Sequence, residues 1–285
     1  MIYKKVVIVI PIHKTIPNEM EIASLLQCFL VFKKREISFI CSKELDTKFY
    51  EETSESYHVN FRKIIFPKKF FVNQEGYNKL CMDKYFYKKF KEYEYMLIYQ
   101  LDAWAFFDDL DKWCEMNYDY IGAPMPTKTE LIKHKTYIDC NVNELNVFDM
   151  VGNGGFSLRK ISKFIGLCSN KWLPILNFKH LFNIYKTKVK KNPIWIFWII
   201  IRRFGWNNSI NRIIKNWHWE DRVFAHLGNL GIINTPPVEL SVSFAFECLP
   251  DVAFHLNRNK LPMGVHSWFW RKYFWKDYIS YFKQK

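Results

Sequence analysis

Apolar and polar positions alternate in blocks along the first part of the chain and predict a β-α-β order. The β-branched run before Pro11 indicates a strand buried on both faces, as in a parallel sheet. Asn18 predicts the N-cap of a helix that continues to about residue 33. Apolar runs predict strands at residues 6–10, 37–41 and 63–66. This order favours an α/β sheet with right-handed crossovers.

The pattern continues more weakly through the middle of the chain. We expect helices at residues 75–92, 108–117 and 160–185, strands at 95–100, 118–122 and 156–158, and an irregular loop over a site at 126–149. The sequence shows no internal repeat and no linker, so we expect one domain over residues 1–285.

Composition narrows the class of protein. Hydrophobic residues make up 49% of the 285 residues, which argues against global disorder. Lys and Arg total 42 against 28 Asp and Glu, a balance of +14 that favours anionic partners. Nucleic-acid binding is therefore one alternative, but no RNP-type sheet motif supports it.

Cysteine use and hydropathy indicate the compartment. The seven cysteines are scattered without a C-x-x-C pair, which favours free thiols in a reducing environment. We see no signal peptide, and no apolar run reaches the roughly 18–20 residues of a membrane span. We therefore expect a cytoplasmic protein.

Two basic, aromatic segments suggest a membrane surface. Residues 193–201 are apolar and precede Arg202 and Arg203, inside a segment at 186–216 that we interpret either as a helical membrane-facing insertion or as a core helix. The C-terminal tail, residues 268–285, alternates aromatic and basic residues in the same way. A peripheral protein on the inner face of the cytoplasmic membrane, or a non-catalytic scaffold there, fits these segments.

A first candidate for chemistry is Asp102, which follows an apolar strand. Ligands of open α/β sheets bind outside the carboxyl ends of the strands, where an acid can hold a divalent cation or a ribose hydroxyl. Only one acid stands in Gln100-Leu-Asp102, where nucleotide-sugar enzymes usually carry Asp-x-Asp, and a helix-capping role for Asp102 is the alternative.

Residues 152–155, Gly-Asn-Gly-Gly, predict a tight turn. Glycine permits positive φ and close backbone approach, so the turn can present amide groups and Asn153 to a sugar, with Gly154 and Gly155 beside it. The pattern is not G-x-G-x-x-G and does not indicate a Rossmann cofactor site.

Aromatic residues surround a later acidic pair. Trp217 and Trp219 can stack on a sugar, while Glu220 or Asp221 can act as a general base, unless the acids only favour a helix N-terminus. His266 can ligate a metal with Asp102 or bond a diphosphate oxygen, although a lone histidine is often structural.

With these motifs the chain resembles a bacterial family with the GT-A glycosyltransferase fold, known as DUF5672. The resemblance rests on residues 6–12, 99–102, 119–124, 152–159, 220–221 and 264–266. It implies a GT-A-like, Rossmann-like α/β domain with a mixed central β-sheet flanked by helices. The Trp-x-Trp-Glu-Asp segment is also similar to the β-1,4-galactosyltransferase pattern.

The resemblance implies transfer of a sugar from a nucleotide-sugar donor, UDP-linked in our prediction, to a saccharide or lipid-linked acceptor of a cell-surface glycan such as lipopolysaccharide, lipooligosaccharide or capsule. We expect an inverting hexosyltransferase that uses Mn²⁺ or Mg²⁺ and binds no nucleic acid. Donor-binding residues are expected to be Pro11, Ile12, His13, Gln100, Asp102 and His266.

Overall fold

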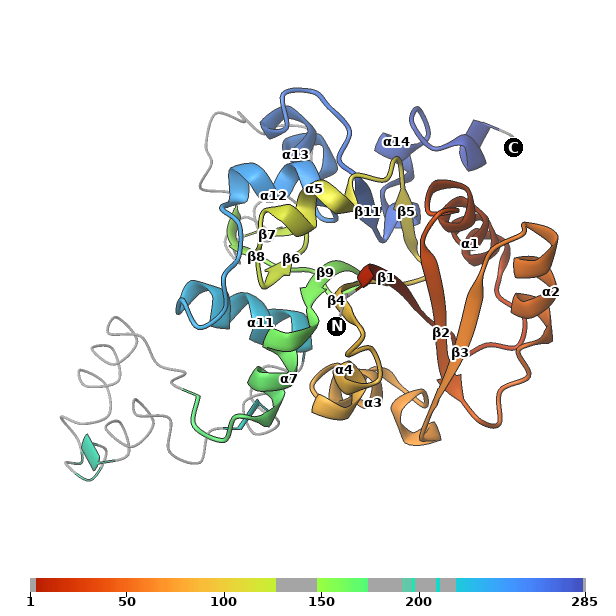
Figure 1. The fold of residues 1–285 in the computed structure, drawn as a ribbon. Helices are drawn as coiled ribbons and strands as arrows, with labels where there is room; N and C mark the ends of the chain where they lie inside the picture. The colour runs from red at the N-terminus through yellow and green to blue at the C-terminus, as the bar shows by residue number, and fades with distance from the viewer. Residues whose placement is uncertain are drawn as a thin grey trace.

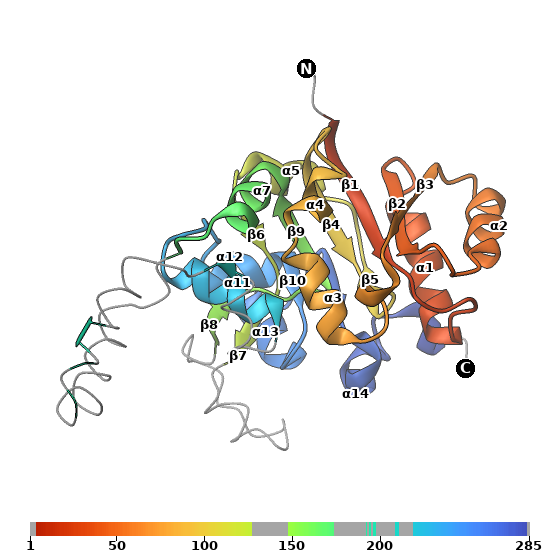
Figure 2. The same cartoon turned by 90° about the horizontal axis from the view of Figure 1, so that it is seen from below.

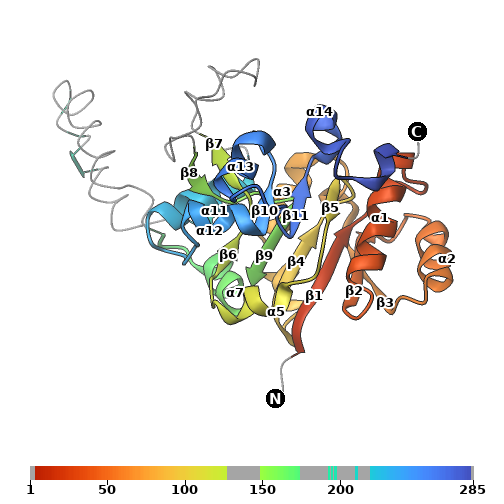
Figure 3. The ribbon, with the colours of Figure 1, turned by 90° about the horizontal axis from the view of Figure 1, so that it is seen from above.

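The computed structural model describes residues 4–126, 148–173 and 219–283, together with residues 192, 194, 196, 197, 209 and 210. Its centre is a six-stranded sheet in the order β3-β2-β1-β4-β9-β6, visible across Figure 3. The strands are β1 (Lys4–Pro11), β2 (Glu36–Ser42), β3 (Phe61–Phe66), β4 (Tyr93–Tyr99), β6 (Tyr120–Ile121) and β9 (Phe156–Lys160). Strands β3, β2, β1 and β4 run parallel, whereas β9 runs antiparallel to both β4 and β6.

The position of β1 at the middle of the sheet explains its unbroken apolar sequence. Val7 and Val9 pack into the core on one face of the sheet, and Ile8 and Ile10 pack into the core on the other. Because both faces are covered, strand alternation separates two apolar surfaces instead of an apolar and a polar one.

Helices cover both faces and make a three-layer α/β domain (Figure 1). One face carries α1 (Glu19–Val31), α2 (Lys48–Ser56) and α5 (Leu110–Glu115). The other carries α3 (Gln74–Cys81), α4 (Lys84–Lys88), α7 (Ile161–Ser169) and α11 (Glu220–Asn229). Asn18 caps α1 as predicted, and Glu21 completes a capping box.

A smaller sheet lies where β1 and β4 end. Its order is β10-β11-β5, formed by β10 (Ala245–Phe246), β11 (Gly264–His266) and β5 (Ala103–Ala105). A third core joins this sheet to the C-terminal tail. Around it lie α12 (Val238–Phe244), α13 (Pro250–Leu256), η5 (Trp268–Arg271), α14 (Lys272–Trp275) and η6 (Ser280–Lys283). Figures 2 and 3 place α14 at the end of the sheet opposite to the start of β1.

Three further elements complete the described chain. They are η1 (Lys68–Phe70) and a two-stranded sheet of β7 (Pro124–Pro126) and β8 (Phe148–Val151). Six cysteines of the described ranges are free, and Cys28, Cys41, Cys81 and Cys114 are buried. Within those ranges no helix has the length and apolarity that a membrane span requires.

The predicted fold class is confirmed, and so are the first four strands, with small differences at their ends. The single helix expected at 75–92 is wrong, because the chain forms two helices and Asp83 caps the second, accepting a hydrogen bond from the Tyr85 amide. In the helix expected at 160–185, α7 ends at Ser169. Residues 127–147, 174–191 and nearly all of 198–218 lie outside the described residues, including most of the expected loop and Trp217.

Candidate functional site

A pocket of about 370 Å³ opens at the carboxyl ends of β1 and β4. Five of the six residues expected to bind a donor line it: Pro11, Ile12, His13, Gln100 and Asp102. The remaining wall combines aromatic and amide side chains from Tyr50, Phe70, Phe71, Asn73, Gln74, Tyr77 and Phe269. Apolar walls with a few convergent polar groups are typical of a site for a small organic ligand.

Charged groups of both signs line this pocket. Lys14 Nζ pairs with Glu21 Oε1 at 2.6 Å, and both residues line the pocket. Burial and the neighbouring Lys14 lower the pKa of His13, so its imidazole is neutral at pH 7. Asp102, which also lines the pocket, supplies a carboxylate just beyond the carboxyl end of β4, next to the small sheet.

Asp102, His266 and Glu247 form a continuous row. His266 Nε2 lies 3.1 Å from Asp102 Oδ1, and His266 Nδ1 lies 3.0 Å from Glu247 Oε1. The small sheet sets this order, because His266 pairs with Ala103 on one side and Phe246 pairs with Val265 on the other. The two predicted metal ligands, 164 positions apart in sequence, are therefore in direct contact.

The charges in this row depend on one another. Burial disfavours the imidazolium, but Asp102 and Glu247 together outweigh it and raise the pKa of His266 well above its usual value. Burial alone would raise the pKa of Asp102, but the charge and hydrogen bond of His266 lower it below its usual value. Both ring nitrogens of His266 thus face a carboxylate, and a cation at Nε2 would take the place of the proton there.

The glycine turn is a packing device as well as a turn. A Cβ on Gly155 would lie 2.1 Å from His266 Nε2, and a Cβ on Gly154 would lie 2.5 Å from Glu220 Oε1. Gly152 alone of these three has a positive φ, of 149°. Asn153 is buried, and its Oδ1 accepts a hydrogen bond from the Gly155 amide at 2.9 Å, so this side chain closes the turn.

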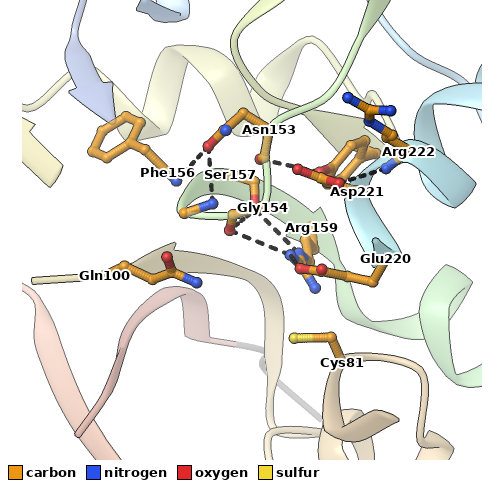
Figure 4. Close-up of polar contacts among 12 residues, drawn as sticks. Cys81, Gln100, Asn153, Gly154, Phe156, Ser157, Arg159, Glu220, Asp221 and Arg222 are labelled. Carbon is orange, nitrogen blue, oxygen red and sulfur yellow. Dashed lines mark hydrogen bonds and ion pairs between the residues drawn. The ribbon is translucent and has the colours of Figure 1, made fainter. Parts of the chain in front are cut away.

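Glu220 belongs to a buried ion-pair network (Figure 4). Its Oε1 lies 3.5 Å from Nη2 of Arg159, a residue with no exposed surface. Arg159 also donates to Ser157 Oγ and Tyr87 Oη, both at 3.1 Å. This pairing fixes the start of α11 against the glycine turn and occupies the Glu220 carboxylate.

Asp221 has a different environment. Burial, Glu220 and Glu247 raise its pKa to about 7, against smaller opposing effects of the Arg222 and Gly154 amides. Its Oδ1 accepts a hydrogen bond from the Arg222 amide at 2.6 Å. Trp219, immediately before this pair, is 40% exposed, so its indole can contact a ligand. A carboxylate with a pKa near 7 suits a general base at neutral pH.

The donor atoms suit a divalent cation only in part. Among the described residues, no group of three or more His, Cys, Asp or Glu side chains is placed to hold a metal ion. Asp102 Oδ1 and Gln100 Oε1 nevertheless lie 3.1 Å and 3.3 Å from His266 Nε2. Bonds of about 2.1 Å at right angles separate two ligands by about 3 Å, so each of these two oxygens lies at a distance from Nε2 that a shared cation would allow.

Sequence reasoning missed Glu247 and the role of Arg159. Glu247 directly follows a two-residue strand, which is too short to show a hydrophobic period. The available signal was its position after the apolar pair at 245–246, the same placement that pointed to Asp102 after β4. Arg159 ends the segment 152–159, which carries part of the family resemblance, but the sequence alone does not indicate which residue it contacts.

The fold and this site define an α/β protein with a ligand pocket and an acid–histidine row at the carboxyl edge of its sheet. The family described as "Protein of unknown function (DUF5672)" matches residues 60–266. The chain belongs to this family. No curated protein matches the sequence.

Several solved structures are similar in fold at low sequence identity. Mouse xyloside xylosyltransferase 1 is 9% identical, with 93% of this chain and 97% of that chain covered and a TM-score of 0.46. The galactosyltransferase LgtC, solved with donor and acceptor sugar analogues, is 12% identical, with 92% and 86% covered and a TM-score of 0.44. Core-mannan synthase A of Aspergillus fumigatus, in an Mn/GDP form, is 12% identical, with 80% and 70% covered and a TM-score of 0.40.

Proposed function

We propose that this protein is a glycosyltransferase of the GT-A type that uses a nucleotide-sugar donor. The observation that carries the proposal is the continuity of the site. Asp102 lines the pocket and contacts His266, His266 contacts Glu247, and Glu247 acts electrostatically on Asp221. We therefore assign the pocket to the nucleoside, the contact of Asp102 with His266 to the diphosphate, and Asp221 to the base.

The pocket supports a nucleoside diphosphate as the donor carrier. Phe71 and Phe269 bring aromatic rings to the pocket that can pack on a base, and Asn73 and Gln74 bring amides. Lys14 supplies a positive charge in the same pocket. We take UDP as the carrier and a hexose as the transferred sugar, in keeping with the family resemblance.

A divalent cation would be held by Asp102, His266 and Gln100. Bound there, Mn²⁺ or Mg²⁺ would neutralise charge on the leaving diphosphate. The protein's own part is to present one carboxylate, one imidazole nitrogen and one amide oxygen from the ends of β4 and β11.

Asp221 is the proposed general base. An acceptor hydroxyl oxygen forms a bond to the anomeric carbon as the bond from that carbon to the diphosphate oxygen breaks. The hydroxyl proton passes to Asp221, and the electron pair of the broken bond leaves with the nucleoside diphosphate. This direct displacement inverts the anomeric centre. Glu220, the other expected catalytic acid, is engaged by Arg159 and is better placed to hold α11.

The test is a donor screen followed by two matched variants. Purified protein is offered UDP-, GDP- and CMP-linked sugars with and without Mn²⁺, and release of the nucleotide is measured. We expect turnover with a UDP-sugar and a fall of about 10²–10⁴-fold in Asp221→Asn. Glu220→Gln removes one charge at the neighbouring position and is the comparison variant; because it also takes the countercharge from Arg159, its folding is checked by thermal melting. Release from no donor, or unchanged turnover in Asp221→Asn, contradicts the proposal.

The acceptor and its location form the finer part of the proposal. We place the enzyme at the inner face of the cytoplasmic membrane, acting on a lipid-linked or saccharide acceptor of a cell-surface glycan such as lipopolysaccharide or capsule. Trp270 and Tyr273 of the tail are 71% and 51% exposed and stand beside Lys272 and Lys276. Ile194 and Phe197 in the second basic segment are also exposed, at 66% and 61%. Aromatic rings beside cationic groups suit a bilayer interface.

Vesicle co-sedimentation tests this location. We expect binding to anionic vesicles that weakens with salt and with Lys272→Glu combined with Lys276→Glu, and no binding to neutral vesicles. Equal sedimentation of wild type and variant, or none with either vesicle, contradicts the membrane assignment while leaving the catalytic proposal intact.

A further inference from the structure

We propose that Glu247 is the residue that positions His266 for a cation. This inference rests on the proposed function, because it assigns the support of the metal-binding imidazole. In the sequence, nothing distinguishes Glu247 from the other acidic residues. In the structure, Glu247 is distinguished by its position, because it lies on the opposite side of the His266 imidazole from Asp102.

The geometry of the contact is well suited to orienting a ring. Glu247 Oε1 lies 3.0 Å from His266 Nδ1, and only 20% of the Glu247 side chain and 13% of the His266 side chain are exposed. The parallel pairing of β10 with β11 carries Glu247 to this point. Ser267 Oγ, at 3.3 Å from the same nitrogen, is a more distant second partner.

The contact determines which nitrogen faces the pocket. A carboxylate only accepts hydrogen bonds at neutral pH, so Glu247 holds the proton on Nδ1. Nε2, which faces Asp102 Oδ1 and Gln100 Oε1, is then the nitrogen whose proton a cation would replace, while Glu247 keeps the proton on Nδ1. Metal-binding histidines commonly donate their second N–H to a carboxylate in this way.

Gly155 limits the ring from a second direction. A Cβ at position 155 would lie 2.1 Å from both Nε2 and Cδ2 of His266. The imidazole therefore packs against bare backbone on one side and is hydrogen-bonded at its far nitrogen by Glu247. Because Glu247 sits at Nδ1, it is not placed to share an ion with Nε2, and its role is support.

Two substitutions separate orientation from charge. Glu247→Gln keeps an acceptor oxygen at the same reach but removes the charge, and Glu247→Asp keeps the charge but withdraws the carboxylate by one methylene. Mn²⁺ affinity of the full chain is measured by isothermal titration calorimetry without any sugar donor. We expect Glu247→Gln to bind Mn²⁺ within a few-fold of wild type and Glu247→Asp to bind about 10–100-fold more weakly. Ser243→Ala, whose hydroxyl bonds Asn257 and no member of this row, is the control for a lost polar side chain and is expected to change affinity little.

Thermal melting of each variant shows whether it is folded. The reverse order, with Glu247→Asp near wild type and Glu247→Gln weakened, would mean that Glu247 acts through its charge and would overturn the proposal. Equal affinity in all variants would also overturn it, while the cation site itself would stand. Failure of the wild type to bind Mn²⁺ would contradict the cation in the proposed function and this inference together.

Discussion

The imidazole of His266 packs directly against the backbone of Gly155, with no space for a side chain between them. This contact joins the glycine turn of the main sheet to the last strand of the small sheet. Packing against His266 therefore explains why residue 155 is a glycine, without any role in ligand binding. The same segment uses Gly154 to admit the Glu220 carboxylate. Gly154 and Gly155 thus reflect crowding by these two side chains, whereas Gly152 has a positive φ.

Gly155→Ala should displace His266 and destabilise the fold. Inserting a methyl group into a filled site typically costs about 1–3 kcal/mol. Gly166→Ala, in α7 with no atom within 4 Å of the added Cβ, is the matched control and should be neutral or slightly stabilising. Urea unfolding of both variants measures the difference. Equal stability of the two would show that the ring moves aside freely.

The pH dependence of turnover should follow Asp221. Burial and the charges of Glu220 and Glu247 raise its pKa to about 7, and a base must be ionised to accept a proton. Turnover should therefore rise with pH through about 7. Glu247→Gln removes one of the charges that raise this pKa and should shift the rising limb to lower pH. A profile that stays flat between pH 6 and 8 would assign proton transfer to another group.

The same shift predicts how stability changes with pH. The pKa of Asp221 is 3.8 in its unfolded reference and about 7 in the folded protein, so between these values the folded state holds a proton that the unfolded state releases. This contribution to stability is complete below pH 4 and is lost as pH rises through 7. Asp221→Asn should therefore raise the melting temperature relative to wild type at pH 8, and much less so at pH 5. Equal differences at both values would rule out the shifted pKa.

Arg159→Met should be among the most destabilising single changes in the described chain. Removing one partner of a buried ion pair leaves Glu220 without its countercharge, at a cost of about 3–5 kcal/mol. Adding Glu220→Gln to Arg159→Met should recover part of that loss. A double-mutant cycle by chemical unfolding measures the coupling, and strictly additive effects would deny that the two residues interact.

Phe269 and Trp270 are adjacent but should have separate roles. Phe269 lines the pocket, whereas Trp270 is 71% exposed. Phe269→Ala should weaken UDP binding, since loss of one aromatic contact costs about 1–3 kcal/mol. Trp270→Ala should leave UDP affinity unchanged and reduce binding to anionic vesicles. Fluorescence titration with UDP distinguishes the two variants. An equal loss of UDP affinity in both would contradict the separate roles assigned to Phe269 and Trp270.

The main sheet could be predicted because its strands carry strong local signals. The run at residues 6–10 is buried on both faces, and Asn18 caps the following helix through a local hydrogen bond. The helix break at Asp83 was missed because the lysine- and tyrosine-rich pattern continues across it, while the capping contact there is local and brief.

The small sheet could not be predicted for a different reason. Its strands have two or three residues, less than one full alternation, and their partners lie far away in sequence. Asp102 and His266 were nevertheless chosen, since each stands beside a turn or strand end. Glu247 could not be predicted because its contact with His266 depends wholly on the pairing of β10 with β11. The engagement of Glu220 by Arg159 is likewise a tertiary fact.

The strands of the main sheet and several residues of the site are synthesised at different times. All six strands of the main sheet lie within residues 4–160 and precede β10 and β11 in the chain. Glu247, His266 and Phe269 are supplied only afterwards. A product cut short after residue 244 would keep every strand of the main sheet but lack the histidine, its carboxylate support and one wall of the pocket. Synthesis of the C-terminal region is thus itself a condition for a complete site.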